Sequence, residues 1–138
     1  VELFEKPHHT FVGHFIGSPG MNLLACEVRG GKAVVGGMPI DTENAAAYAG
    51  GASTLQLGIR PEFVRFAAEG LPVQVTKVAD AGRFNIVSAR AGEQPLKILV
   101  PQGANVPSGA ANVAFDPARA RIYADGWLVA DPARGAAR

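Results

Sequence analysis

The sequence predicts an all-β domain built from many short strands. Apolar residues alternate with polar ones in short runs along most of the chain, and each run ends near a glycine or a proline. The 17 glycines and 10 prolines among the 138 residues are spread over the whole length, which is typical of frequent turns and not of disorder. A chain of this size buries about 68% of its unfolded surface, so we expect one domain with one sizeable core.

The first element is predicted to be a short helix near the N-terminus. Within the stretch KPHHTFVGHFIG, apolar residues recur at i, i+1, i+4 and i+5, which places four of them on one helical face: Phe11, Val12, Phe15 and Ile16. Pro7 suits the first turn of such a helix. Gly17 is well placed just after its end, and Pro19 cannot continue it. We therefore expect residues 1–20 to form a connector helix and a turn.

From Asn22 onward the apolar residues alternate with a period of two, which predicts about seven short strands. The sequence RGGK, Arg29 to Lys32, is predicted to form the turn of a first hairpin, and Cys26 is expected in the core. Ile122 and Leu128 are assigned to a last, weaker strand. The other residues expected to point inward are the alternating ones: Leu24, Val28, Leu55, Leu57, Ile59, Leu71, Val73, Val75, Phe84, Ile86, Leu96, Ile98, Val100, Val113 and Phe115.

Two irregular segments are predicted among these strands. Residues 41–51 are expected to form a loop or one or two helical turns, with Asp41 or Thr42 as the N-cap. The alternation in LPVQVTKVADAG loses its phase at Val78, because Lys77 stands where an apolar residue was due, and this indicates a β-bulge. Bulges of this kind let a sheet curl into a small barrel.

The charge pattern does not favour a polyanionic partner. Thirteen Lys and Arg against twelve Asp and Glu give a formal charge of +1, and the two signs alternate along the chain. Phenylalanines and arginines are interleaved at 63–66 and 83–84, as in proteins that bind single-stranded nucleic acid. The phenylalanines mostly stand at inward-facing positions of the predicted strands, which favours core packing. No nucleic acid is therefore expected as a partner. Oligonucleotide binding through one face of the domain is kept as a third hypothesis, which salt-dependent affinity would reveal.

The cysteine count and the hydropathy indicate a soluble protein of a reducing compartment. Cys26 is the single cysteine, which excludes an internal disulfide. The sequence has no run of 18 apolar residues, no signal-peptide pattern and no lipidation motif.

The spacing of candidate chemical groups supports neither catalysis nor metal binding. His8, His9 and His14 lack the i, i+3 or i, i+4 spacing of a helical metal pair, so exposed polar residues are the favoured interpretation. The GGK at 30–32 lies in a predicted turn and not between a strand and a helix, as a P-loop would. Ser18 lacks the G-x-S-x-G context of a catalytic nucleophile. We therefore assign no catalytic residue, no cofactor and no metal ligand to this chain.

Three stretches of the sequence resemble one family closely. They are LFEKPHHTFVGHFIGSPGMNLL near the N-terminus, LGIRPEFV at 57–64 and VAFDPARARIY at 113–123. Their content and order are similar to those of the C-terminal regulatory domain of the ATP-binding subunits of ABC importers for sugars and glycerol-type solutes. The form GSPGMN, with Gly20 in place of a second proline, looks more like the importers for glycerol or glycerol phosphate than like the maltose group.

The resemblance implies a fold, a domain organisation and partners. The fold would be an OB-like barrel with extra strands, of the type called TOBE, over residues 21–130. Residues 1–20 would connect it to an upstream ATPase domain, which would bind ATP and Mg²⁺, and residues 131–138 would be a frayed tail. The partners would be a second ATPase subunit, giving a homodimer, the membrane subunits of the transporter, and a regulatory protein or small ligand. The location would be cytoplasmic, at the inner face of the plasma membrane.

The same resemblance gives a candidate dimer or regulatory surface, made of seven motif residues: Met21, Asn22, Arg60, Pro61, Glu62, Phe115 and Asp116. They would support either the closure of the barrel or contact with the second subunit. The competing interpretation is turn and strand chemistry alone, since Arg60 and Glu62 flank a proline and can form a solvated pair. An alternative function is a sensor for small oxyanions such as molybdate, with residues 100–109 and Lys77 as donors, although the tandem repeat of such sensors is missing.

Overall fold

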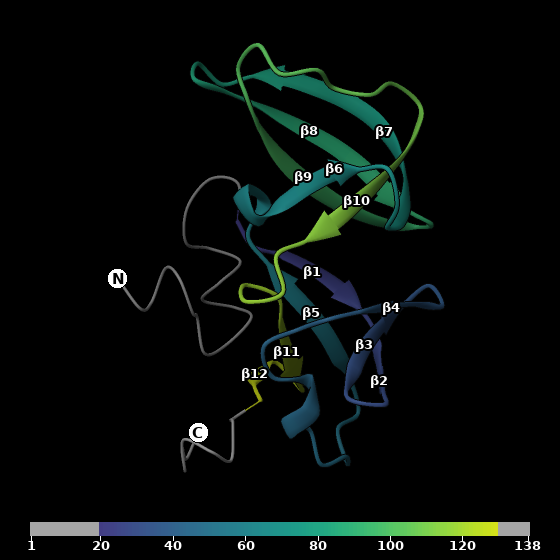
Figure 1. Ribbon diagram of the computed structural model, residues 1–138. Coiled ribbons are helices and arrows are strands. Elements are labelled where there is room, and N and C mark those ends of the chain that lie inside the picture. The colour runs from purple at the N-terminus through teal and green to yellow at the C-terminus, as the bar shows by residue number, and fades with distance from the viewer. Residues whose placement is uncertain (1–19, 130–138) are drawn as a thin grey trace.

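The computed structural model describes residues 20–129, which form an all-β structure (Figure 1). In chain order the elements are β1 (Asn22–Ala25), β2 (Glu27–Arg29), β3 (Lys32–Val35), β4 (Met38–Ile40), the 3₁₀ turn η1 (Ala45–Ala47), β5 (Leu55–Ile59), the 3₁₀ turn η2 (Pro61–Phe63), β6 (Val64–Ala67), β7 (Leu71–Asp80), β8 (Phe84–Ala91), β9 (Gln94–Pro101), β10 (Ala110–Phe115), β11 (Arg121–Ala124) and β12 (Trp127–Leu128). The expected all-β class is confirmed.

The number of strands differs from the expected seven. The described part of the chain holds twelve strands. The sequence underestimates this number because several strands have only two to four residues, which is too short for a period to show. The predicted connector helix and the predicted tail of 131–138 lie outside the described residues. Gly20, the last residue of the predicted connector, is described and is not helical.

The strands form three antiparallel sheets. A five-stranded sheet with the order β6-β10-β7-β8-β9 makes up the upper part of the molecule in Figure 1. A four-stranded sheet, β1-β5-β11-β12, and a three-stranded sheet, β2-β3-β4, lie below it. In the five-stranded sheet the outermost strands, β6 and β9, lie close to each other, so this sheet curls toward a barrel.

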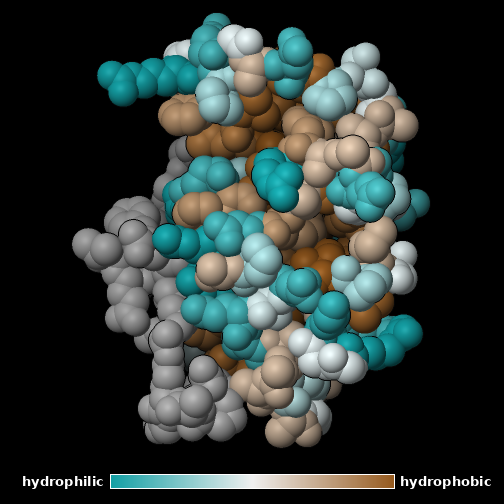
Figure 2. Space-filling model, in the orientation of Figure 1, coloured by the Kyte–Doolittle hydropathy of each residue, from teal (hydrophilic) through white to brown (hydrophobic). Residues whose placement is uncertain are grey.

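One hydrophobic core cluster takes residues from all three sheets. Strand alternation explains how: Leu96, Ile98 and Val100 of β9 are buried, while the residues between them are exposed or partly exposed. The same alternation supplies buried residues from the other strands, including Leu24, Val35, Leu57, Val87, Val113 and Ile122. Figure 2 shows the consequence at the surface, where hydrophobic residues lie in recesses between hydrophilic ones.

The first hairpin is confirmed, and the strand before it needs one correction. Arg29 pairs with Lys32, so the turn lies where the RGGK sequence placed it. The run from Asn22 to Arg29 is not one strand, because the chain changes its partner at Cys26: β1 pairs with β5, whereas β2 pairs with β3. Cys26 is therefore only partly buried against the core and does not lie fully inside it.

In the second half of the chain the bulge is confirmed and two expectations are corrected. The register of β7 against β8 shifts between Val75 and Lys77. Phe84 and Ile86, expected to point inward, share the outer face of β8 with Ser88 and Arg90, and Phe84 is 41% exposed. The inward-facing residues of β8 are Val87, Ala89 and Ala91. The expected last strand is a hairpin of β11 and β12, whose two-residue turn has a positive φ at both positions, 50° at Asp125 and 89° at Gly126.

Candidate functional site at the junction of the sheets

The described parts of the three sequence motifs meet where the chain passes between the four-stranded and the five-stranded sheet. The chain makes this passage after β5, through residues 60–63, and again after β10, through residues 116–120. The two passages lie side by side, because the amide of Asp116 donates to the carbonyl of Phe63 at 3.0 Å. Asn22, at the start of β1, pairs with Ile59 at the end of β5 and therefore lies next to the first passage.

Two side-chain amides join β1 to β9, the edge of the five-stranded sheet. The Nδ2 of Asn22 donates to the carbonyl of Lys97 at 2.9 Å, and its Oδ1 accepts from the Lys97 amide at 2.8 Å. Gln94 does the same in return: its Oε1 accepts from the amide of Ala25 at 2.6 Å, and its Nε2 donates to the Ala25 carbonyl at 3.5 Å. Each side chain thus takes the place of a peptide group in a strand ladder.

Gly58 of the GIRPE motif is required by close packing. A Cβ at this position would lie 2.7 Å from Cε1 of Tyr123 and 3.0 Å from Sδ of Met21. Tyr123 and Met21 are buried and form, with Leu128, a second small hydrophobic cluster. Burial raises the pKa of Tyr123 well above its ordinary value of 10.0, so the side chain is a neutral aromatic group at physiological pH.

Arg60 and Glu62 form an ion pair at the surface of the junction. Arg60 Nε lies 2.9 Å from Glu62 Oε2, and the two side chains are 18% and 36% exposed. Pro61 between them is fully buried and opens η2, whose turn is closed by the amide of Phe63 donating to the carbonyl of Arg60 at 3.0 Å. The guanidinium of Arg119 lies 4.7 Å from the centroid of the Phe63 ring, within the range of a cation–π contact.

The Phe-Asp pair near the end of the chain builds a turn. Phe115 ends β10 and is buried, whereas Asp116 is exposed. The Oδ1 of Asp116 accepts from the amide of Ala118 at 3.0 Å. The carbonyl of Asp116 accepts from the amides of Arg119 at 2.9 Å and Ala120 at 3.0 Å. An aspartate that bonds its own backbone two residues on is a common way to start such a turn.

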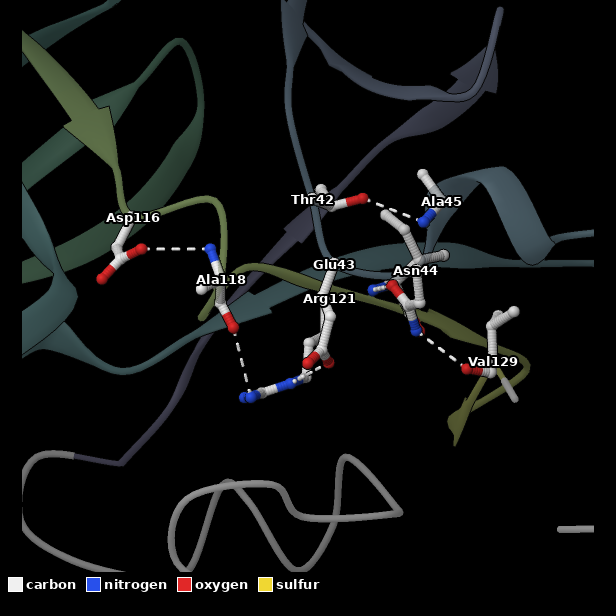
Figure 3. A network of polar contacts seen from close by, with 9 residues as sticks. Thr42, Glu43, Asn44, Ala45, Asp116, Ala118, Arg121 and Val129 are labelled. Atoms are coloured by element: carbon white, nitrogen blue, oxygen red, sulfur yellow. Dashed lines mark hydrogen bonds and ion pairs between the residues drawn. The ribbon is translucent and has the colours of Figure 1, made fainter. Parts of the chain in front are cut away.

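Polar contacts continue from this turn to the loop before η1 (Figure 3). Arg121, with a side chain only 10% exposed, donates from Nε to Oε1 of Glu43 at 2.8 Å and from Nη2 to the carbonyl of Ala118 at 3.3 Å. Asn44 is 5% exposed, donates to the carbonyl of Ile122 at 3.1 Å and accepts from its amide at 2.7 Å. The loop is thereby fixed to the start of β11.

The sequence reasoning missed Glu43, Asn44 and Arg121. The only local signal was the polar segment before the three alanines at 45–47, which indicated a helix N-cap. The expected N-cap, Asp41 or Thr42, is wrong: Asn44 is the N-cap of η1 and makes no side-chain cap bond, although Oγ1 of Thr42 accepts a hydrogen bond from the amide of Ala45 at 2.9 Å. The Arg121 and Ile122 partners of Glu43 and Asn44 are each 78 residues away in the sequence, so no local pattern could reveal them.

The structure therefore brings the expected site residues together, but it buries most of them. Four are in the interior: Met21, Asn22, Pro61 and Phe115. Three have side chains at least partly at the surface: Arg60, Glu62 and Asp116. Burial assigns the first four to packing at the junction, whereas a contact of the other three with a second copy stays a prediction.

Other expected chemistry is placed apart from this junction. Lys77 lies on β7, and the segment 100–109 leads from β9 toward β10, where the carbonyl of Gly109 accepts from the amide of Val75 at 2.9 Å. Oxyanion binding by these residues stays a prediction. Within residues 20–129, no group of three or more His, Cys, Asp or Glu side chains is arranged to hold a metal ion. None of the helical turns described there approaches the length and apolarity of a membrane-crossing helix.

Comparison with known proteins gives one consistent family. Residues 17–64 match the family described as MalK OB fold domain. The chain is 37% identical over 102 residues to the sn-glycerol-3-phosphate import ATP-binding protein UgpC of Bordetella avium. This alignment covers 71% of the present chain and 28% of that protein. It is 31% identical over 124 residues to the protein of the same name from Jannaschia sp.. That alignment covers 88% of the present chain and 35% of the relative.

The chain therefore spans about a third of the length of these relatives. The match to an OB fold domain, together with the antiparallel sheets, confirms the OB-like fold class that the sequence predicted.

Proposed function

Because this chain belongs to the MalK-type OB-fold domains of importer ATP-binding subunits, we propose that it is a non-catalytic regulatory and dimerisation domain of such a subunit. The subunit would take part in the import of glycerol phosphate, glycerol or a carbohydrate. ATP and Mg²⁺ would bind to an upstream domain, and the subunit would work with membrane subunits at the inner face of the plasma membrane.

One observation carries this proposal. The described residues of the family motifs converge on a single junction whose interior is packed, while its charged members, Arg60, Glu62 and Asp116, lie at least partly at its surface. These side chains are held in place by local bonds, the Arg60–Glu62 ion pair and the Asp116 turn. A rigid surface of charged groups on a packed base is suited to recognising another protein surface.

Sedimentation equilibrium on this chain over a wide concentration range tests the pairing role. We expect a monomer–dimer equilibrium, with dimerisation weakened by Glu62→Gln and by Asp116→Asn, which removes the charge and keeps an acceptor for the turn. Glu93→Gln, in the β8–β9 turn, removes an exposed carboxylate elsewhere and should leave the dimer constant unchanged. A chain that stays monomeric at every concentration contradicts the pairing role of this domain.

The non-catalytic part of the proposal has its own test. The chain alone should release no phosphate from ATP in the presence of Mg²⁺, measured with a coupled phosphate assay. Hydrolysis that stays proportional to the amount of chain through successive purification steps, and that is lost when the chain is unfolded, would contradict it.

A further inference from the structure

A row of basic and hydroxyl side chains crosses the outer face of the five-stranded sheet. Ser88 of β8 pairs with Lys77 of β7 on one side and with Lys97 of β9 on the other, and directly paired residues point to the same face of a sheet. Their neighbours Val87 and Ile98 are fully buried, so the row lies on the outer face. The Nζ of Lys97 donates to the Oγ of Ser88 at 3.0 Å.

Arg90 adds a third positive charge to this face. It lies two residues beyond Ser88 on β8 and is exposed. Among residues 20–129, no carboxylate forms an ion pair with Lys77, Arg90 or Lys97. Like charges near one another on a sheet are destabilising, and the whole chain carries a formal charge of only +1. The gathering of basic groups here is therefore a local feature of this face and not a result of a basic composition.

A groove of about 480 Å³ runs beside this row. One wall is the segment 20–23, which leads into β1, and the other wall comes from β8 and β9. Its lining combines apolar and basic or hydroxyl side chains, among them Leu23, Pro95, Thr76, Ser88, Arg90 and Lys97. A hollow of this kind is suited to an apolar group flanked by negative charges.

We propose that this basic face binds an acidic segment of a regulatory protein, with an apolar side chain in the groove and carboxylates against Lys77, Arg90 and Lys97. The inference rests on the regulatory role proposed above and names the chemistry of the partner. Lys77 and Lys97 lie two strands apart, which is about 10 Å between backbones. Carboxylates at alternate positions of an extended segment, about 7 Å apart, can meet several of the cations, and an apolar side chain between them can fill the groove, which a lone phosphate or sulfate would leave empty.

Fluorescence polarisation of a labelled peptide tests this inference on the intact chain. The probe is a short glutamate-rich peptide with one central leucine, and the matched probe has glutamine in place of each glutamate. We expect only the glutamate peptide to bind, with an affinity that falls as salt rises. Lys77→Gln, Arg90→Gln and Lys97→Gln should each weaken binding about fivefold. Arg29→Gln removes one exposed positive charge from a different sheet and should leave the affinity unchanged.

Three results would overturn the proposal. One is equal binding of the two peptides, and another is an equal loss of affinity in the Arg29→Gln variant. The third is displacement of the peptide by sulfate or phosphate beyond the effect of chloride at the same ionic strength, which would assign the face to a small anion. Circular dichroism shows whether each variant is folded. Sedimentation equilibrium on the same samples reports the dimer separately, so failure of this proposal and failure of the pairing role are read independently.

Discussion

Gly58 lies on β5 between two buried side chains that leave no space for a methyl group. Because a Cβ would lie 2.7 Å from the Tyr123 ring, we expect Gly58→Ala to lower the free energy of unfolding by about 1–3 kcal/mol, the usual cost of overpacking a core. Urea denaturation measures the loss. Gln56→Ala, at a partly exposed position of the same strand, should change stability by less than about 0.5 kcal/mol. Equal losses in the two variants would contradict the packing argument.

Burial also sets the reactivity of Cys26. It raises the pKa of the thiol from 9.0 to about 11, and the charge of Glu27 adds a smaller rise. Since the folded state favours the neutral thiol, its contribution to stability is fully present below pH 9 and is lost as the pH rises through about 11. We expect Cys26→Ala to remove part of the alkaline loss of stability in this window.

The same burial should slow alkylation of Cys26. In the wild type at about pH 8, iodoacetamide should react slowly with the thiol until urea unfolds the chain. Alkylation without urea at the rate of an exposed cysteine thiol would contradict this.

At the scale of elements, the loop before η1 depends on its bond to β11. Glu43→Ala removes the carboxylate that lies 2.8 Å from Nε of Arg121, whose side chain is only 10% exposed, so we expect a loss of about 2 kcal/mol. The matched control is Asp41→Ala in the same loop, whose ion pair with Lys32 has side chains 63% and 53% exposed. That pair should contribute under about 1 kcal/mol. Chemical denaturation of both variants decides, and a larger loss in Asp41→Ala would contradict the assignment.

The elements that were predictable from the sequence are those with a local signal. The alternation of β9, the turn after Arg29 and the bulge before Lys77 all depend on neighbours in the sequence. The sequence predicts one strand where the structure has the last hairpin, because β12 has two residues and gives no period. Short strands such as β2 and β4 are held by their partners in the sheet more than by their own pattern.

The candidate site was located by its motifs but not explained by them. Asn22 was expected in barrel closure or in a dimer contact, and its hydrogen bonds to Lys97, 75 residues away, assign it to packing between sheets. Gly58 belongs to the same motif group and is explained only by Tyr123, which lies on another strand. Such contacts join distant parts of the chain, so their physical reasons became visible only in the folded structure.

At the scale of the whole molecule, the five-stranded sheet is joined to the others by the two chain passages and by the reciprocal amides of Asn22 and Gln94. If these amides couple the sheets, the chain unfolds in one cooperative step. We expect the double variant Asn22→Ala, Gln94→Ala to broaden the calorimetric transition, so that the van't Hoff enthalpy falls below the calorimetric enthalpy.

The matched control for this prediction is Gln102→Ala. The side chain of Gln102 donates to Oδ1 of Asp80 at 3.2 Å, so it bonds within the five-stranded sheet and not between sheets. Its loss should lower stability slightly and leave the ratio of the two enthalpies unchanged. A double variant that still unfolds in one sharp step, with equal enthalpies, would mean that the continuous apolar core alone couples the sheets, and that the amides fix the register of β1 on β9 without setting cooperativity.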